Sequence, residues 1–148
     1  MSRDVVGRVD ERAIAAWSEH DVEGVVAMLA EKFVWRDVGL PEPLRTVDEV
    51  RAYVRGWIEA FPDLKLEQTN RVVQDDAVAA ELVFTGTNTG PLRVAGAQLP
   101  PTNRPAIGRG AYFSRFEGDK VVEFSAYPDL AGMLVQLGLL RGGTTAAT

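Results

Sequence analysis

The chain of 148 residues has the length of one ordinary domain. Apolar residues make up 46% and charged residues 25%, which is the balance of a folded globular protein. The net charge of -5 and the scattered arginines disfavour a nucleic-acid partner, which needs a basic patch. Without cysteine the chain has no disulfides, thiolate zinc sites or cysteine nucleophiles. We expect a single domain over residues 1–140 and a flexible tail over 141–148.

Further classes of protein are disfavoured by what the chain lacks. Its apolar runs fall well short of the ~20 residues that a membrane span needs, so no membrane partner is expected. With neither a signal peptide nor disulfides, a cytoplasmic location is the default expectation. His20 is the only histidine, and a lone histidine does not make the ligand set of a catalytic metal site. We therefore predict no catalytic metal site.

The first third of the chain alternates between two kinds of apolar pattern. Helical spacing predicts an amphipathic helix over residues 4–19 and a short helix over 22–30 that Asp21 caps. A two-residue period then predicts a strand over 32–38. Three side chains share one face of that strand: Phe33, Trp35 and Asp37.

The clearest predicted helix begins after Thr46. Thr46 and Glu49 have the spacing of a capping box, in which each side chain binds a backbone N–H of the other residue. An apolar stripe follows at helical spacing, and Pro62 ends the helix. The stripe consists of Val50, Tyr53, Val54, Trp57, Ile58 and Phe61.

The second half of the chain is predominantly strand-like. We predict strands at 64–73, 78–85, 106–116 and 120–127, a long loop at 86–105, and a short last helix from Leu130. Helices followed by hairpin strands predict an α+β fold with an antiparallel sheet. The long loop, which is rich in Gly and Pro, is expected to border a pocket and to be more mobile than the sheet.

Five segments of the chain resemble the SnoaL-like polyketide cyclases, which are also called ester cyclases. The likeness runs from about residue 14 to residue 140, and the segments stand in the family's order: AWSEHDVEGVVAMLAEKFVWRD, RTVDEVRAYVRGWIEAFPDLKLE, FTGTNTGPL, LPPTNRPA and FSRFEGDKVVEFSAYPDLAGMLVQLGLL. The resemblance implies a cone of curved antiparallel sheet closed by the N-terminal helices, as in nuclear transport factor and ketosteroid isomerase. It also implies ring closure by intramolecular aldol condensation, with an acid/base carboxylate and no metal or cofactor.

Asp37 is the first candidate for the catalytic base. It ends a predicted strand on the face that carries Trp35, and a carboxylate beside aromatic walls suits proton abstraction. The segment also resembles the stretch of ketosteroid isomerase that supplies the base. The alternative is a strand-end aspartate that binds a turn N–H.

Asp129 is the second candidate. The family often has an acid near the join of the last strand and the last helix, where a frequent form reads Glu-His-Trp-Asp. Here the corresponding residues are Glu123, Phe124, Ser125 and Ala126, so the usual acid is replaced by Ala126. Asp129 is the nearest acid that can stand in for it, although an aspartate before a helix is also an ordinary N-cap.

The remaining candidates are substrate-binding residues. An aromatic set is expected to serve both as core and as pocket wall: Trp17, Trp35, Tyr53, Trp57 and Phe61. The tyrosine that ketosteroid isomerase carries on its first helix falls near Ala13, so Tyr112 or Tyr127 is a candidate donor instead. Arg109 either turns inward to pair with Asp37 or Glu81, or outward to a dimer face.

These features favour a cyclase-type enzyme that acts on a small apolar or aromatic carbonyl compound. Two alternatives stay open: an isomerase or epoxide hydrolase on the same fold, and a non-catalytic binding or dimerisation module, which Ala126 favours. Apolar residues on both faces of the later strands, such as Val83 beside Phe84, predict a homodimer through the outer face of the sheet.

Overall fold

A five-stranded sheet in the order β1-β7-β6-β3-β2 forms the body of the molecule. The structure is a computed structural model, and it describes residues 3–141. The strands are β1 (Leu29–Asp37), β2 (Lys65–Val73), β3 (Ala77–Thr87), β6 (Pro105–Glu117) and β7 (Lys120–Pro128). β1 runs parallel to β7, and all other neighbours in this sheet are antiparallel. The predicted α+β fold with a curved, mainly antiparallel sheet is confirmed.

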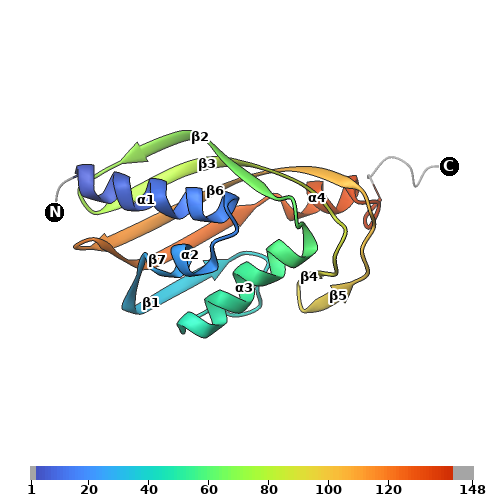
Figure 1. Cartoon of the computed structure of the whole chain (residues 1–148), viewed down its shortest axis with the longest axis horizontal. Helices are drawn as coiled ribbons and strands as arrows, with labels where there is room; N and C mark the ends of the chain where they lie inside the picture. The colour runs from blue at the N-terminus through green and yellow to red at the C-terminus, as the bar shows by residue number, and fades with distance from the viewer. Residues whose placement is uncertain (1–2, 142–148) are drawn as a thin grey trace.

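Helices line one side of the sheet. They are α1 (Arg3–Ser18), α2 (Val22–Val26), α3 (Val47–Ala60) and α4 (Leu130–Gln136). Figure 1 shows α1, α2 and α3 along one side of the sheet and α4 towards its far end. The capping box of α3 is present as predicted. The Glu49 backbone N–H donates to Thr46 Oγ1 at 3.2 Å, and the Thr46 backbone N–H donates to Glu49 Oε1 at 3.0 Å. None of the described helices is long and apolar enough to cross a membrane.

The main hydrophobic core lies between these helices and the inner face of the sheet. The apolar stripe of α3 faces the sheet, where Val50 and Val54 are completely buried. Trp35 of β1 packs in the same cluster and is also completely buried. The period-two pattern of β1 is therefore real, with Phe33, Trp35 and Asp37 buried on one face.

The start of β1 differs from the sequence prediction. α2 ends at Val26, and the strand begins at Leu29 instead of residue 32. Leu29 pairs with Val121 of β7, whose backbone N–H donates to the Met28 carbonyl at 2.8 Å. Pairing with a strand far away in the sequence thus overrides a helical apolar spacing that looked continuous.

The predicted loop at 86–105 is partly ordered as a small hairpin. β3 extends to Thr87, and β4 (Leu92–Val94) pairs with β5 (Ala97–Leu99). Ala95 and Gly96 make the turn with positive φ angles of 51° and 78°. Of the predicted flexible tail, residues 142–148 lie outside the described part of the chain.

Candidate functional site

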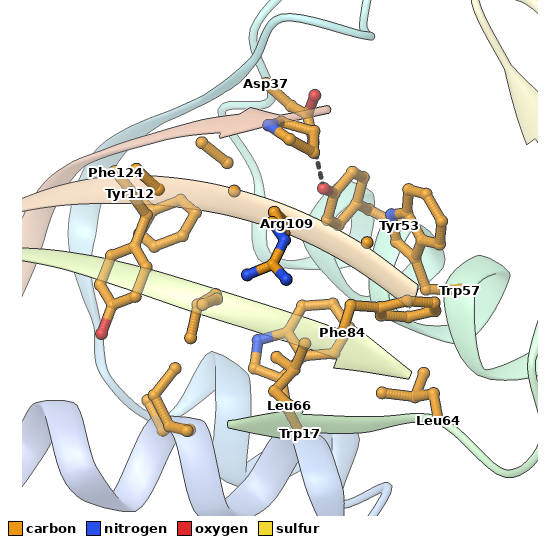
Figure 2. A pocket seen from close by; sticks show the side chains of 18 of the residues that line it. Trp17, Asp37, Tyr53, Trp57, Leu64, Leu66, Phe84, Arg109, Tyr112 and Phe124 are labelled. Atoms are coloured by element: carbon orange, nitrogen blue, oxygen red, sulfur yellow. Dashed lines mark hydrogen bonds between the residues drawn. The ribbon is translucent and has the colours of Figure 1, made fainter. Parts of the chain in front are cut away.

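A cavity of about 140 Å³ lies between the inner face of the sheet and the helices. Its lining comes from α1, β1, α3, β2, β3, β6, β7 and α4, and most of it is apolar or aromatic. Figure 2 shows Tyr112 and Phe124 on the opposite side of this cavity from Tyr53 and Trp57. A concave, mainly apolar site with few polar groups is typical of small-molecule binding.

Four members of the predicted aromatic set line the cavity: Trp17, Trp35, Tyr53 and Trp57. Tyr53 lies among the three indoles, with ring centroids 6.4 Å from Trp17, 5.6 Å from Trp35 and 6.5 Å from Trp57. All three pairs are edge-on contacts, an arrangement that aromatic rings favour. The ring of Tyr53 is therefore held in place by its neighbours.

Phe61, the fifth member of the aromatic set, does not line the cavity. It is completely buried and stacks behind Trp57, with ring centroids 6.1 Å apart. Its side chain belongs to a second core cluster with Leu64 and Met133. The prediction that Phe61 lines the cavity is corrected, because α3 ends at Ala60 and Phe61 turns into this cluster.

Asp37 is a buried carboxylate of the site. Only 7% of the residue is exposed, and it lines the cavity. Its Oδ1 accepts a hydrogen bond from the Gly39 backbone N–H at 2.7 Å, and its Oδ2 accepts a short one from the Tyr53 hydroxyl, drawn as a dashed line in Figure 2. The turn contact expected of a strand-end aspartate is thus present together with the contact to a cavity tyrosine. Each oxygen keeps a further lone pair for a ligand.

The surroundings of Tyr53 keep its hydroxyl protonated. Burial and the negative charge of Asp37 raise the pKa of Tyr53 well above its usual range, and the indole groups of Trp57 and Trp35 act weakly in the opposite direction. The Nε1 of Trp35 is buried and has no hydrogen-bond partner among the described residues. Such an unmade bond is costly, and this buried N–H belongs to the ring that contacts Tyr53 edge-on.

Asp129 lies at the border of the cavity in a different environment. Its Oδ1 accepts a hydrogen bond from the Gly132 backbone N–H at 2.9 Å, which makes it the N-cap of α4. The residue is exposed although it contributes to the lining. The structure therefore brings both candidate carboxylates to one cavity, with Asp37 inside and Asp129 at the rim.

Tyr127 and Arg109 lie on outward positions of their strands. Tyr127 is 57% exposed and absent from the cavity lining, because Ala126 takes the inward position of β7. Arg109 touches the cavity border, but its residue is exposed and it alternates with the inward Gly108 and Gly110. The prediction that Tyr127 lines the pocket is corrected. Arg109 forms no ion pair with Asp37 or Glu81, so the carboxylate–arginine group of an epoxide hydrolase is not assembled.

Tyr112 lines the cavity as predicted. Its hydroxyl contacts Asp10, a residue that the sequence analysis did not identify as a candidate. Its hydroxyl donates to Asp10 Oδ1 at 2.5 Å, and Gln68 Nε2 donates to both Tyr112 and Asp10 at 2.6 and 2.8 Å. Asp10 is only 4% exposed. A signal was available, since Asp10 interrupts the apolar stripe of α1 between Val9 and Ala13.

A second pocket of about 270 Å³ adjoins the cavity. Asp37, Tyr53 and Trp57 line both spaces, so they form the partition between them. The expected single closed cavity is therefore corrected to two neighbouring spaces. β4 supplies part of the second lining with Leu92, Arg93 and Val94, so the 86–105 segment does border a pocket, as predicted.

Among residues 3–141, no three His, Asp or Glu side chains gather in a way that could hold a metal ion. The groups that the cavity offers for chemistry include three carboxylates, those of Asp10, Asp37 and Asp129, the phenols of Tyr53 and Tyr112, and indole N–H groups. Such a set can move a proton and donate hydrogen bonds to a carbonyl oxygen.

Comparison with known proteins gives the family. The model of the SnoaL-like polyketide cyclases matches residues 7–137, nearly the whole chain. The chain belongs to this family. Nogalonic acid methyl ester cyclase of Streptomyces nogalater is 30% identical over 101 residues, which cover 67% of this chain and 72% of the relative.

Solved structures of family size superpose closely. AclR of Streptomyces galilaeus, described as a candidate hydroxylase, has a TM-score of 0.81 at 26% identity, with 99% of this chain and 88% of that chain covered. IdmH of Streptomyces antibioticus, a candidate polyketide cyclase, has a TM-score of 0.71 at 25% identity, with 89% and 97% covered. The family model, the Streptomyces nogalater relative and IdmH support a function of the cyclase or isomerase type.

Within the SnoaL-like family, the departure at Ala126 acquires a structural meaning. Ala126 lines the cavity and pairs directly with Asp37 on β1 and with Tyr112 on β6. Asp37 thus lies one strand away from the position at which the resemblance implied an acid. Ala13, where the resemblance implied a tyrosine, also lines the cavity.

Proposed function

We propose that this chain is a cyclase of the SnoaL-like type that removes a proton next to a carbonyl group with Asp37 as the base. One observation carries the proposal: Asp37 is a buried carboxylate in an apolar, aromatic cavity, and the Tyr53 hydroxyl rests on it. A carboxylate in such a place is costly to keep, and active sites are where that cost is commonly accepted.

The proposed reaction begins with an apolar carbonyl compound held between the aromatic rings. Asp37 takes the proton from the carbon next to the carbonyl, and the electrons of the C–H bond move onto the carbonyl oxygen to form an enolate. The enolate carbon then attacks a second carbonyl carbon of the same molecule, which forms the new C–C bond and an alkoxide. The alkoxide regains the proton from Asp37, so the product is an isomer of the substrate.

Tyr53 is proposed as the hydrogen-bond donor to whichever oxygen carries the negative charge, first that of Asp37 and then that of the enolate. While Asp37 is ionised, the phenol donates to the carboxylate. Once Asp37 holds the abstracted proton, that hydrogen bond weakens and the phenol can donate to the enolate oxygen instead. The unpartnered N–H of Trp35 lies in the same aromatic cluster, where a slight shift of its ring offers a second donor.

Asp37 is preferred to Asp129 as the base because of their contacts. Asp129 is exposed and already caps α4, which accounts for its presence without chemistry. An isomerase would share the first proton transfer, so it stays an alternative outcome of the same site. A binding module without chemistry is the reading that Ala126 favours, and the assay below distinguishes it.

Nogalonic acid methyl ester, for which the Streptomyces nogalater relative is named, is the first compound to test. The expected result is a product of unchanged mass and shifted chromatographic retention. In Asp37→Asn the rate of product formation is expected to fall by about 100-fold or more. Asp129→Asn is the matched control and is expected to retain most of the rate. Equal rates for the wild type and Asp37→Asn would contradict the proposal.

A further inference from the structure

Asp10, Tyr112 and Gln68 form a buried polar cluster on the α1 side of the cavity. Asp10 and Tyr112 both line the cavity, and each is only 4% exposed. Figure 2 shows the Tyr112 hydroxyl directed away from Asp37, so the cluster and the Asp37–Tyr53 pair lie at different sides of the cavity. The reaction proposed above makes no use of this cluster.

The hydrogens of the cluster are all directed at its own oxygens. Tyr112 donates to Asp10, and one Gln68 amide nitrogen lies within 2.6 Å of the Tyr112 oxygen and 2.8 Å of Asp10 Oδ2. Arg71 adds an ion pair to Asp10 at 3.5 Å. What remains free on Asp10 and Tyr112 are lone pairs, so the cluster can accept a hydrogen bond from a ligand but has no proton of its own to offer.

The cost of the cluster argues for a role beyond folding. Burial, the charge of Asp10 and the hydrogen bond to Asp10 raise the pKa of Tyr112 far above its usual range. Asp10 is almost fully buried, whereas the Arg71 side chain that pairs with it is 25% exposed, and such a pair is often no more stabilising than apolar residues of the same volume. Asp10 and Tyr112, two polar side chains in the wall of a mainly apolar cavity, therefore serve best as a recognition element.

A second and independent observation comes from Ser114. It lies two residues after Tyr112 on the same face of β6, lines the cavity and is only 2% exposed. Its hydroxyl forms no hydrogen bond with any other described residue. A hydroxyl that faces the cavity without a protein partner, beside a set of acceptors, can complete its hydrogen bonds with a polar group of a ligand.

We propose that Asp10, Tyr112 and Ser114 form a subsite that binds a hydroxyl group of the ligand. The hydroxyl donates to the Asp10–Tyr112 oxygens and accepts from Ser114. The proposal deepens the proposed function and rests on it for the other end of the ligand, where the C–H group beside the carbonyl lies at Asp37 and the carbonyl oxygen lies near the Tyr53 hydroxyl. The ligand class that fits both ends is a hydroxylated aromatic ketone, with the hydroxyl and the reacting carbonyl on opposite sides of the ring system.

Two ligands of equal size test the subsite: 6-hydroxy-1-tetralone and 6-methyl-1-tetralone. Calorimetry is expected to show that the wild type binds the hydroxy compound roughly five- to tenfold more tightly, as one well-made hydrogen bond allows. In Tyr112→Phe and Asp10→Asn the two ligands should bind with nearly equal Kd. In Asp37→Asn the preference should persist.

Thermal melting of each variant shows whether a lost ligand preference comes from the binding site or from unfolding of the protein. Asp10→Asn leaves Arg71 without its buried partner and is expected to lower Tm, whereas Tyr112→Phe keeps the ring and its packing against Phe124 at 5.4 Å. Tyr112→Phe alone therefore suffices if Asp10→Asn does not fold. The proposal is overturned if the wild type shows no preference, if a folded Tyr112→Phe keeps it, or if Asp37→Asn abolishes it. Because only binding is measured, these outcomes are independent of whether Asp37 performs catalysis.

Discussion

Two aspartates at the same cavity illustrate how neighbours decide what a residue can do. Asp37 and Asp129 each accept a hydrogen bond from a backbone N–H two or three residues later in the chain. Of the two, only Asp37 also accepts a hydrogen bond from a phenol, that of Tyr53, and only Asp37 is buried. The local turn at Asp37 and the helix cap at Asp129 each account for an aspartate at that place in the sequence. The tertiary contact to Tyr53 distinguishes Asp37 as the aspartate that suits acid/base chemistry.

The two cavity tyrosines predict a loss of stability at alkaline pH. The folded state raises the pKa of Tyr53 and of Tyr112, so it keeps protons that the unfolded chain loses above pH ~10. Their contribution is fully present below that pH, and the free energy of unfolding falls as the pH rises beyond it. Urea unfolding followed by tryptophan fluorescence between pH 8 and pH ~11 measures this decline.

Tyr53→Phe and Tyr112→Phe supply the comparison. Each variant removes one group that titrates late, so its unfolding free energy should decline less steeply above pH ~10 than that of the wild type. Ultraviolet titration of the folded variants should likewise lose one late-ionising phenol each. Identical slopes in all three proteins would show that these phenols are not perturbed.

At the scale of elements, the inward face of β6 is shaped to leave space. Gly108 and Gly110 occupy inward positions of β6 opposite Phe84 and Leu82, and both line the cavity. A Cβ at Gly108 would meet Phe84 at 3.6 Å, an ordinary contact distance. The glycine is therefore not required by packing at this position, and the space that it leaves belongs to the cavity.

Gly108→Ala is expected to preserve or slightly raise stability, by up to about 0.5–1 kcal/mol, since glycine is unfavourable inside a strand. The same change should weaken binding of 6-hydroxy-1-tetralone several-fold, because the methyl group takes up cavity volume. Gly110→Ala is the matched control: its Cβ would lie 3.0 Å from the Pro128 Cα, so this variant should lose stability. Unfolding curves and calorimetry measure the two effects, and unchanged affinity in Gly108→Ala would exclude Gly108 from the binding surface.

Elements also show where sequence reasoning succeeds. The two-residue period placed Trp35 and Asp37 on one buried face, because side-chain direction along a regular strand follows from position alone. The capping box likewise located the start of α3. The same rule, applied to β7 from Ala126, would have turned Tyr127 outward.

What could not be predicted depends on contacts between distant segments. The start of β1 is set by pairing with β7, and the role of Asp10 is visible only beside Gln68 and Tyr112, which lie 58 and 102 residues away. For Asp10 a local sign did exist, because this charged residue interrupts the apolar stripe of α1. Nothing local indicated that Phe61 packs behind Trp57 instead of facing the cavity.

At the scale of the whole molecule, the outer face of the sheet carries apolar side chains that the helices do not cover. Ile107 and Phe113 of β6 and Tyr127 of β7 are 55%, 47% and 57% exposed. All three occupy outward strand positions, and Ala111 pairs with Tyr127 while Phe113 pairs with Ser125. We propose that this face joins two copies of the chain, since large exposed apolar patches on a sheet commonly mark interfaces.

Light scattering at micromolar concentration is expected to give the mass of a dimer. Phe113→Glu should shift the mass to that of a monomer, because it places a charge within the patch, whereas Val38→Glu, at an exposed apolar residue beyond the end of β1, should not. A wild-type monomer under these conditions would contradict the dimer.

The proton transfer to Asp37 is tested most directly by hydrogen exchange at the C2 carbon of 1-tetralone in D2O, followed by NMR. The wild type is expected to accelerate loss of the C2–H signal, Asp129→Asn to do so nearly as well, and Asp37→Asn to be slower by about 100-fold or more. This measurement requires no knowledge of the natural substrate and no ring closure. Exchange by Asp37→Asn at the wild-type rate, or its loss in Asp129→Asn alone, would contradict Asp37 as the base.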